Sequence, residues 1–216
     1  MLTVWSVCVG KKYNHGYVRI LRNMVARNLS LPHKFKCMSD RQIDDIETVK
    51  PPTDLQGWWA KLGLFCEGFA DEHNLYLDLD VIVTGPLDGL VTRYCNEPLA
   101  TPWNWAQSGH GGCQSSVMAW GGTDAYKIYK EFDHADAHWP PINGPGFYWG
   151  DQEWVTKMRD DGTFPVTRID DDLVRSYKYH ARPLGKVPPN CRVVVFHGKP
   201  DPSECVNVPW VRENWR

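Results

Sequence analysis

Two aspartates, Asp78 and Asp80, stand two positions apart in the apolar run Leu75–Val83. Apolar residues on both sides are typical of a buried strand, where a carboxylate requires a partner or a metal ion. If both aspartates lie where the strand ends, their oxygens can reach one divalent cation, and oxygen ligands suit Mg²⁺ or Mn²⁺. Such a cation commonly holds a diphosphate. The run therefore indicates an enzyme that handles a nucleotide or another phosphate ester, although Asp-x-Asp in other surroundings is mostly a solvated turn.

Other polar residues also follow apolar runs directly. They are Gly10, Lys11 and Lys12 after the first run, Ser39 and Asp40 after the second, and His197 and Lys199 after the last. Ligands of open α/β sheets bind at the carboxyl ends of the strands. The sequence therefore predicts that one sheet edge gathers these residues with the aspartate pair.

The residues that position this edge alternate between strand-like and helix-like patterns. Strands are predicted over 3–9, 35–38, 75–83, 98–101, 115–120 and 192–196. Helices are predicted over 13–29, 57–70, 123–132 and 151–158, and irregular structure over 41–55, 109–112 and 138–149. Strand–helix–strand order at the start predicts an α/β fold with a mostly parallel sheet flanked by helices.

Composition excludes several classes of protein. The chain has 216 residues and a formal net charge of −2, which predicts a single domain and argues against a general polycation for nucleic acid. The sequence has no run of 18 apolar residues, so we expect no membrane span. No basic residues precede the apolar stretch at its start, which therefore predicts a first strand and not a signal peptide. The seven scattered cysteines include no Cys-x-x-Cys, so we expect reduced thiols and a cytoplasmic protein.

Tryptophan is abundant, with 11 residues. Several should be core, but others fall in turn-like or Gly/Pro-rich surroundings, namely Trp58, Trp59, Trp103, Trp105, Trp139 and Trp149. Exposed aromatic faces near a cleft are platforms for sugars or bases. We therefore expect at least one of these tryptophans to line a binding site.

Six short segments carry a family resemblance when taken in order. They are Gly10–Tyr13, Trp59–Leu62, Tyr76–Asp80, Gln114–Met118, Gly150–Glu153 and Phe196–Pro200. In order and spacing the chain resembles GT-A glycosyltransferases, with the pattern of the glycogenin and bacterial lipopolysaccharide galactosyltransferase group in a compact phage or bacterial form. The resemblance implies one Rossmann-like GT-A domain over residues 1–216 and a nucleotide-sugar donor, foremost a UDP-sugar.

The resemblance also implies a metal site. In such enzymes the Asp-x-Asp pair binds Mn²⁺ or Mg²⁺ on the donor diphosphate. The resemblance therefore implies that Asp80 is a direct metal ligand. Asp78 would either be a second ligand or contact the ribose and the sugar. A late histidine completes the site, and His197 takes that position. This mixed oxygen and imidazole set suits Mn²⁺.

Two lysines match family positions near the donor phosphates. Lys199 would neutralise the leaving diphosphate, because breaking the sugar–phosphate bond builds negative charge on the nucleotide. Lys61 would lie near the donor phosphate and sugar, although a solvated helix lysine explains it equally well.

Other donor contacts follow from the resemblance. Val9, Gly10 and Tyr13 match the turn that holds base and ribose, and Tyr13 could equally be a core residue. Ser115 and Ser116 match the segment that touches the sugar hydroxyls. The family more often has Asn there, so the sugar specificity stays open.

Asp151 opens a predicted helix, where an acidic side chain also favours the helix dipole. The resemblance puts Asp151 or Gln152 beside the reacting sugar carbon and the acceptor. An inverting enzyme needs a carboxylate to take the acceptor proton, and a retaining enzyme needs a group on the opposite sugar face. Asp151 or Glu153 suits either role, and the resemblance favours retention.

The acceptor remains open among a surface glycan, a protein side chain and hydroxymethylated phage DNA. A basic set could serve a polyanionic acceptor, although a solvated helix face is the more common explanation. Its members are Lys11, Lys12, Arg19, Arg22, Arg27, Lys34 and Lys36.

Two rival functions also fit an Asp-x-Asp. A haloacid-dehalogenase-type phosphatase carries its motif near the chain start with Thr or Val two residues after the second Asp, whereas Ile82 stands at that position here. A non-catalytic GT-A module would bind nucleotide or glycan without turnover. Asp78, Asp80, His197 and Lys199 together favour the enzyme.

Overall fold

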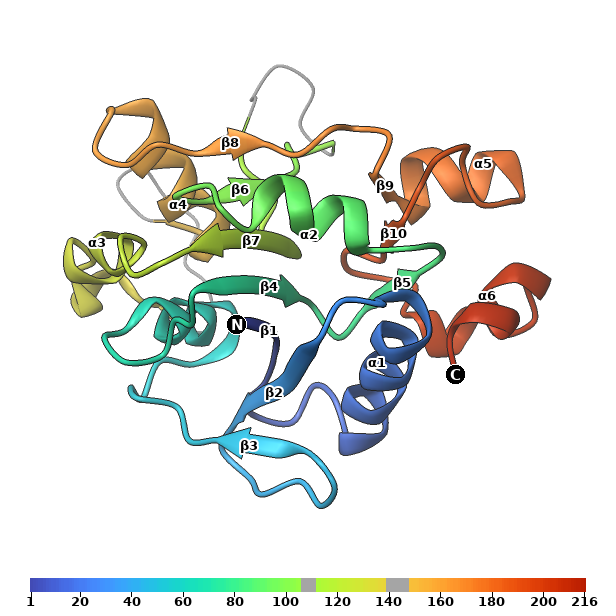
Figure 1. Cartoon of the computed structure of the whole chain (residues 1–216), viewed down its shortest axis with the longest axis horizontal. Helices are drawn as coiled ribbons and strands as arrows, with labels where there is room; N and C mark the ends of the chain where they lie inside the picture. Colours follow the sequence, from blue (N-terminus) through green and yellow to red (C-terminus); the bar gives the residue numbers. More distant parts are fainter. Residues whose placement is uncertain (106–111, 139–147) are drawn as a thin grey trace.

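The structure, a computed structural model, describes residues 1–105, 112–138 and 148–216. Within these ranges the main sheet has seven strands in the order β3-β2-β1-β4-β7-β6-β8 (Figure 1). The strands are β1 (Leu2–Cys8), β2 (His33–Ser39), β3 (Glu47–Val49), β4 (His73–Leu77), β6 (Ala100–Thr101), β7 (Val117–Gly121) and β8 (Thr167–Arg168).

The direction of the strands brings several chain segments to one edge. Four of the six neighbouring pairs are parallel, whereas β7 runs antiparallel to β4 and β6, so the sheet is mixed and mostly parallel as predicted. Val117, the first residue of β7, pairs with Leu77, the last of β4. The start of β7 therefore lies at the edge where β1 and β4 end.

A second sheet of three strands lies beside the first. It contains β5 (Val81–Val83), β10 (Val193–Val195) and β9 (Val174–Ser176) in the order β5-β10-β9. The prediction of one strand over 75–83 is therefore wrong, because β4 and β5 belong to different sheets and Asp78–Asp80 forms the turn between them. Val195 pairs with Val81, which brings the end of β10 to the same turn.

Helices cover both faces of the main sheet. They are α1 (His15–Asn28), α2 (Asp88–Tyr94), α3 (Tyr126–Lys130), α4 (Asp151–Asp160), α5 (Arg182–Leu184) and α6 (Pro209–Asn214). Tighter or wider turns are η1 (Gly57–Phe65), η2 (His134–Asp136), the π-helical η3 (Tyr177–Ala181) and η4 (Pro202–Cys205). In α1, Asn14 caps the helix by accepting a hydrogen bond from the Gly16 amide at 2.8 Å.

Alternate residues of the central strands enter two different cores, as the period of a strand requires. Val4, Leu75, Leu77, Val117 and Ala119 pack with α1 and α2. Trp5, Tyr76, Met118 and Trp120 pack with η1, α3 and α4 on the other face. The second core thus links the strands to the two elements, η1 and α4, that reach the functional edge.

Some element predictions need correction. The predicted helix over 57–70 is the shorter 3₁₀ helix η1, where Met38 Sδ and Pro52 Cδ lie within 3.2 Å of the place a Gly63 Cβ would occupy. The helix predicted over 123–132 is shorter in the structure, where it is α3. A turn comes before it, in which the Tyr126 amide donates to the Thr123 carbonyl. Parts of the irregular ranges 109–112 and 138–149 lie outside the described residues.

All seven cysteines are buried and unpaired, as expected for reduced thiols. None of the helices in the described ranges has the length and apolar character needed to cross a membrane.

Candidate functional site

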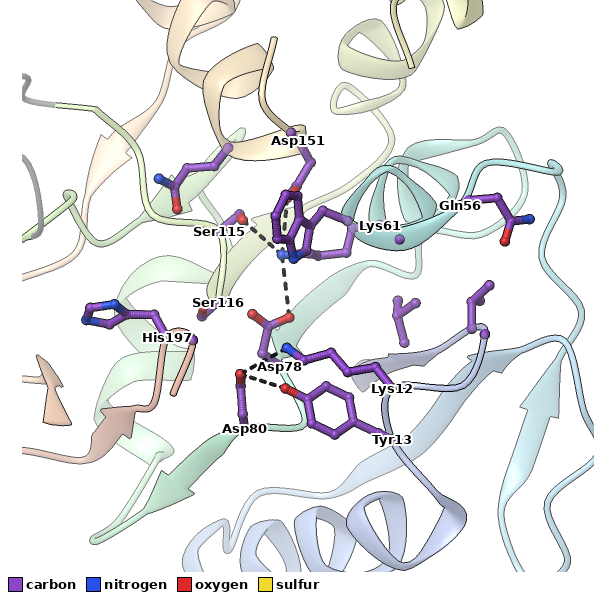
Figure 2. A pocket seen from close by; sticks show the side chains of 18 of the residues that line it. Lys12, Tyr13, Gln56, Lys61, Asp78, Asp80, Ser115, Ser116, Asp151 and His197 are labelled. Carbon is purple, nitrogen blue, oxygen red and sulfur yellow. Dashed lines mark hydrogen bonds and ion pairs between the residues drawn. The ribbon is translucent and has the colours of Figure 1, made fainter. Parts of the chain in front are cut away.

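A pocket of about 600 Å³ opens at the shared edge, a size typical of small-ligand sites. Its walls come from the loop after β1, the turn after β4, the segment before β7, η1, the start of α4 and the end of β10 (Figure 2). The predicted site residues that line it are Val9, Gly10, Tyr13, Lys61, Asp78, Asp80, Ser115, Ser116, Asp151, Gln152 and His197. Lys199 is not among its lining residues.

The turn that carries Asp78 and Asp80 is held by backbone hydrogen bonds on both sides. The Asp78 amide donates to the Ser116 carbonyl at 2.9 Å, and the Phe196 amide donates to the Asp80 carbonyl at 3.0 Å. Leu79, between them, is 2% exposed in the core under α1. Because Leu79 faces the core, both carboxylates face the pocket (Figure 2).

Asp80 is the more buried carboxylate, with 8% of its side chain exposed. The Tyr13 hydroxyl donates to its Oδ2 at 2.8 Å, and Lys12 Nζ lies 3.7 Å from the same oxygen. Burial and the neighbouring charge of Asp78 raise the pKa of Asp80 to about 7, although Lys12 and Tyr13 act in the opposite direction. The negative charge of Asp80 is therefore only partly compensated.

Asp78 shares a buried lysine with Asp151. Lys61 Nζ lies 3.5 Å from Asp78 Oδ1 and 3.3 Å from Asp151 Oδ2, and donates to Ser115 Oγ at 3.0 Å. The Tyr76 hydroxyl donates to the same oxygen of Asp78. Lys61 thus joins η1, β4, α4 and the segment before β7 at one point.

The charges of this cluster decide its protonation. Burial lowers the pKa of Lys61, but the charges of Asp151 and Asp78 outweigh it and leave that pKa raised. Burial also raises the pKa of Asp151, despite the opposing charge of Lys61. Asp151 Oδ2 has no hydrogen-bond partner of good geometry among the described residues, so a ligand hydroxyl could supply the missing donor.

The loop after β1 is held by the two residues that follow β2. Gly10 adopts a φ of 77°, which favours glycine. Its amide donates to Asp40 at 3.1 Å, and its carbonyl accepts from Arg41 at 2.6 Å. The Tyr13 ring packs on Tyr17 with centroids 4.9 Å apart, so Tyr13 serves the carboxylate pair while keeping the aromatic contact expected of a core residue.

Ser115 and Ser116 are buried at the start of β7. Gln114 folds over Ser116, accepting from its amide at 2.7 Å and donating to its hydroxyl at 2.9 Å. Ser115 is bound to Lys61, so both hydroxyls already have protein partners.

His197 lines the pocket, but its ring is turned away from Asp78 and Asp80 (Figure 2). Its Nε2 lies 2.6 Å from Ser176 Oγ, and its ring stacks on Tyr179 at 5.7 Å between centroids. Burial, then the nearby Lys178 and His180, lower the pKa of His197 to about 4, which leaves it neutral.

Lys199 does not line the pocket, although its neighbour Gly198 does. Its Nζ donates to Asp201 at 2.6 Å and to Glu204 at 2.9 Å, and 73% of its side chain is exposed. The structure therefore brings together the predicted donor-site residues except Lys199.

Two tryptophans form part of the pocket wall next to Asp151. Trp58 and Trp149 stack at 6.3 Å between centroids with 23° between their planes, and Trp149 is 43% exposed. A Cβ on Gly150 would lie 3.2 Å from the Trp58 ring, so glycine allows this close approach. Trp59, in contrast, is fully buried, and Trp139 lies outside the described residues.

The predicted basic set is spread over separate contacts. Arg19 and Arg22 pair with Asp45, and Arg27 donates to carbonyls at the C-terminus. Lys11 and Lys12 are the members of the set that line the pocket. This favours the solvated-face explanation for the arginines.

Sequence reasoning missed the contribution of Tyr76 and Gln56. Gln56 lines the pocket just before η1. Tyr76 belongs to the apolar run that predicts a buried strand, and its ring is buried while its hydroxyl donates to Asp78. Spacing offered a signal, since Tyr76, Asp78 and Asp80 alternate onto one face of an extended chain.

The carboxylate pair fits a divalent cation. Asp78 and Asp80 both face the pocket, and the negative charge of the more buried Asp80 is only partly compensated. A bound cation would supply the missing positive charge. Across the described residues, no group of three His, Cys, Asp or Glu side chains is arranged to hold a metal ion. His197 would have to leave Ser176 to join the pair.

Comparison with solved structures finds relatives of the whole fold. GlyE, a glycosyltransferase of Streptococcus pneumoniae TIGR4, matches 94% of this chain with a TM-score of 0.64 and 15% identity. The chain spans only 56% of GlyE. Galactosyltransferase LgtC, in complex with donor and acceptor sugar analogues, matches 97% of this chain and 93% of its own, with a TM-score of 0.63 and 16% identity.

The chain has the GT-A fold. An active-site mutant of LgtC matches as well, with a TM-score of 0.57 and 15% identity over 93% of this chain and 89% of the mutant. No protein-family model and no curated protein sequence matches the chain. These structural likenesses confirm the predicted fold, and their sequence identities are too low to carry the activity with them.

Lys61→Met tests the buried cluster. Without the ammonium, Asp78 and Asp151 stay buried without their cation, so the free energy of unfolding should fall by about 3–5 kcal/mol in urea denaturation. Lys157→Met is the matched control, since it breaks an exposed pair with Asp161 and should cost under about 1 kcal/mol. Adding Asp151→Asn to Lys61→Met should recover part of the loss. Equal losses for the two lysine variants would contradict the role of Lys61.

The raised pKa of Asp80 predicts a pH dependence of stability. Between about pH 4 and pH 7 folded Asp80 retains a proton that the unfolded chain releases, so this group lowers stability as the pH rises. Asp80→Asn removes this effect, and its stability relative to the parent should increase by about 1–3 kcal/mol between pH 5 and pH 8 in urea titrations.

Asp161→Asn is the control for this pH series. Lys157 lowers the pKa of Asp161 to about 2, so the stability that this pair adds is lost only in more acidic solution. Its difference from the parent should stay flat between pH 5 and pH 8. A flat difference for Asp80→Asn as well would refute the raised pKa.

Proposed function

We propose that this protein is a metal-dependent glycosyltransferase that moves a sugar from a nucleotide-sugar donor, a UDP-sugar, to an acceptor hydroxyl. The observation that carries the proposal is the turn Asp78–Asp80. It presents two carboxylates, one of them buried and undercompensated, to a pocket that also holds the Lys61–Asp151 pair. The GT-A fold adds support, since the solved relatives GlyE and LgtC are glycosyltransferases.

Asp78 and Asp80 would hold Mn²⁺ or Mg²⁺, with His197 as a further ligand after it leaves Ser176. The ion would neutralise the donor diphosphate and so stabilise the charge that develops on the leaving group. The protein's own part is to fix the carboxylates. The Ser116 carbonyl, the Phe196 amide and the Tyr13 hydroxyl hold the turn in its orientation.

The donor nucleoside would lie along the loop after β1, where Val9 and Gly10 line the pocket. The positive φ of Gly10 shapes this loop, and Asp40 and Arg41 hold its amide and carbonyl. The sugar would then lie toward Ser115, Lys61 and Asp151, because these line the pocket on the other side of the carboxylate pair (Figure 2).

Asp151 and Gln152 are the proposed catalytic pair at the start of α4. Asp151 Oδ2 accepts no hydrogen bond from the residues that the structure describes, and Lys61 Nζ orients it from 3.3 Å. Such a carboxylate could orient the reacting sugar or take the acceptor proton. Its raised pKa also brings it closer to the proton affinity needed for that transfer.

Among the acceptor classes, the pocket wall favours a glycan over a protein side chain or modified DNA. The Trp149 face is partly exposed beside Asp151 and backed by Trp58. Sugar rings pack their C–H faces on such aromatic surfaces. Gln152 and Glu153, which also line the pocket, offer polar groups for hydroxyls.

Nucleotide binding gives the first test. UDP with Mn²⁺ should raise the melting temperature, and a concentration 100 times Kd should add about 2.7 kcal/mol of stability, since the ligand binds only the folded state. GDP, CDP and TDP serve as comparisons. Asp80→Ala should lose the Mn²⁺-dependent part of the shift, whereas Asp161→Asn, remote from the pocket, should keep it. Absence of a shift with every nucleotide would remove the proposal.

Turnover tests the catalytic role of Asp151. Asp151→Asn should lower release of UDP from a UDP-sugar by about 100-fold or more, because the carboxylate acts on reacting atoms. Its Kd for UDP with Mn²⁺ should change little, because the carboxylate pair is intact. Asp160→Asn, at the exposed far end of α4, is the control. Binding without turnover in the parent, across all donors and acceptors, would favour the non-catalytic module instead.

A further inference from the structure

Lys12 lines the pocket beside the carboxylate pair, whereas Lys199 is not among the residues that line it. We infer that Lys12, on the loop after β1, is the lysine that binds the donor diphosphate and stabilises it as it leaves. The inference rests on the proposed function and assigns to Lys12 the role that the family resemblance gives to Lys199.

The two lysines differ in what they would give up to meet a phosphate. Lys199 Nζ makes two short hydrogen bonds, to Asp201 and Glu204, within η4 and the residue before it. Among the residues that the structure describes, Lys12 Nζ has one ion-pair contact, at 3.7 Å from Asp80, and it lies 4.5 Å from the centre of the Tyr13 ring. Because this ion-pair distance is longer than a hydrogen bond, the ammonium can turn to an anion without breaking a close pair.

The charges around the pocket leave few cations for a diphosphate. Asp78, Asp80, Asp151 and Glu153 line it together with three lysines, which are Lys11, Lys12 and Lys61. Lys61 is committed between Asp78 and Asp151 and bonded to Ser115. Of the other two, Lys12 is the one whose ammonium reaches the carboxylate pair.

Lys12 and a divalent cation would act together. The Lys12 ammonium, 3.7 Å from Asp80 Oδ2, supplies part of the charge compensation of that carboxylate. A metal ion on Asp80 would take over that compensation, and Lys12 could then pair with the phosphate held by the same ion. The ammonium would need to move only a short way, since both partners share one site.

The reaction shows where this charge matters. The bond between the sugar carbon and the phosphate oxygen breaks, and its electron pair stays on the departing diphosphate. The acceptor oxygen forms the new bond to the sugar carbon, and its proton passes to Asp151 or to the departing oxygen. Negative charge therefore builds on the phosphate nearest the sugar, where a cation lowers the barrier.

The test compares Lys12→Met with Lys199→Met in the full-length protein. With Mn²⁺, Lys12→Met should raise the Kd for UDP by about tenfold, whereas the Kd for UMP, which lacks the second phosphate, should change less than about threefold. UDP release from the donor should slow by about 10–100-fold. Lys199→Met should change each quantity by less than about threefold.

Two further variants complete the comparison. Lys12→Arg keeps the charge and should recover most of the UDP affinity, and the exposed Lys186→Met should match the parent. Melting temperatures without ligand verify that each variant folds. A parent that binds UDP while Lys199→Met alone loses it would overturn the inference and leave the proposed function intact. A parent that binds no nucleotide would overturn both.

Discussion

The buried ammonium of Lys61 holds two carboxylates that come from distant parts of the chain. Asp78 follows β4 directly and Asp151 begins α4, and both are within 3.5 Å of this one nitrogen. Removing two carboxylates from water carries a large free-energy cost, which only a cation or a set of hydrogen bonds can offset. The position of α4 against η1 and β4 therefore depends on this contact as well as on the second core.

The same constraint gives the pocket its chemical asymmetry. Lys61 is buried and contacts Asp78 and Asp151 at 3.5 and 3.3 Å, whereas the ion pair of Asp80 in the described part of the chain is with the exposed Lys12 at 3.7 Å. A buried cluster with fixed contacts suits groups that orient a sugar, and a buried carboxylate whose lysine partner is exposed suits a cation. The protein thus separates a fixed half, formed by Lys61, Asp78 and Asp151, from a half where Lys12 and Asp80 could exchange partners.

Tyrosine hydroxyls support both halves from within the cores. Tyr76, in β4, is buried in the second core, and its hydroxyl donates to Asp78. Tyr13 packs on Tyr17, and its hydroxyl donates to Asp80. An aromatic body in the core with a polar tip in the pocket fixes a carboxylate while adding apolar burial. Stability and the geometry of the site therefore depend on the same side chains.

The sequence by itself determined the α/β fold, the period of the central strands and the grouping of the aspartate pair with other strand-end residues, because apolar periodicity and the order of strands and helices are local properties of the chain. It could not decide that 75–83 divides between two sheets, since both halves are equally apolar. Nor could it decide which lysine meets the pocket. Lys199 and Lys12 both follow strands, and only the tertiary structure pairs Lys199 with Asp201 and Glu204 and brings Lys12 to Asp80. Side-chain partners depend on contacts across the fold, which local spacing does not contain.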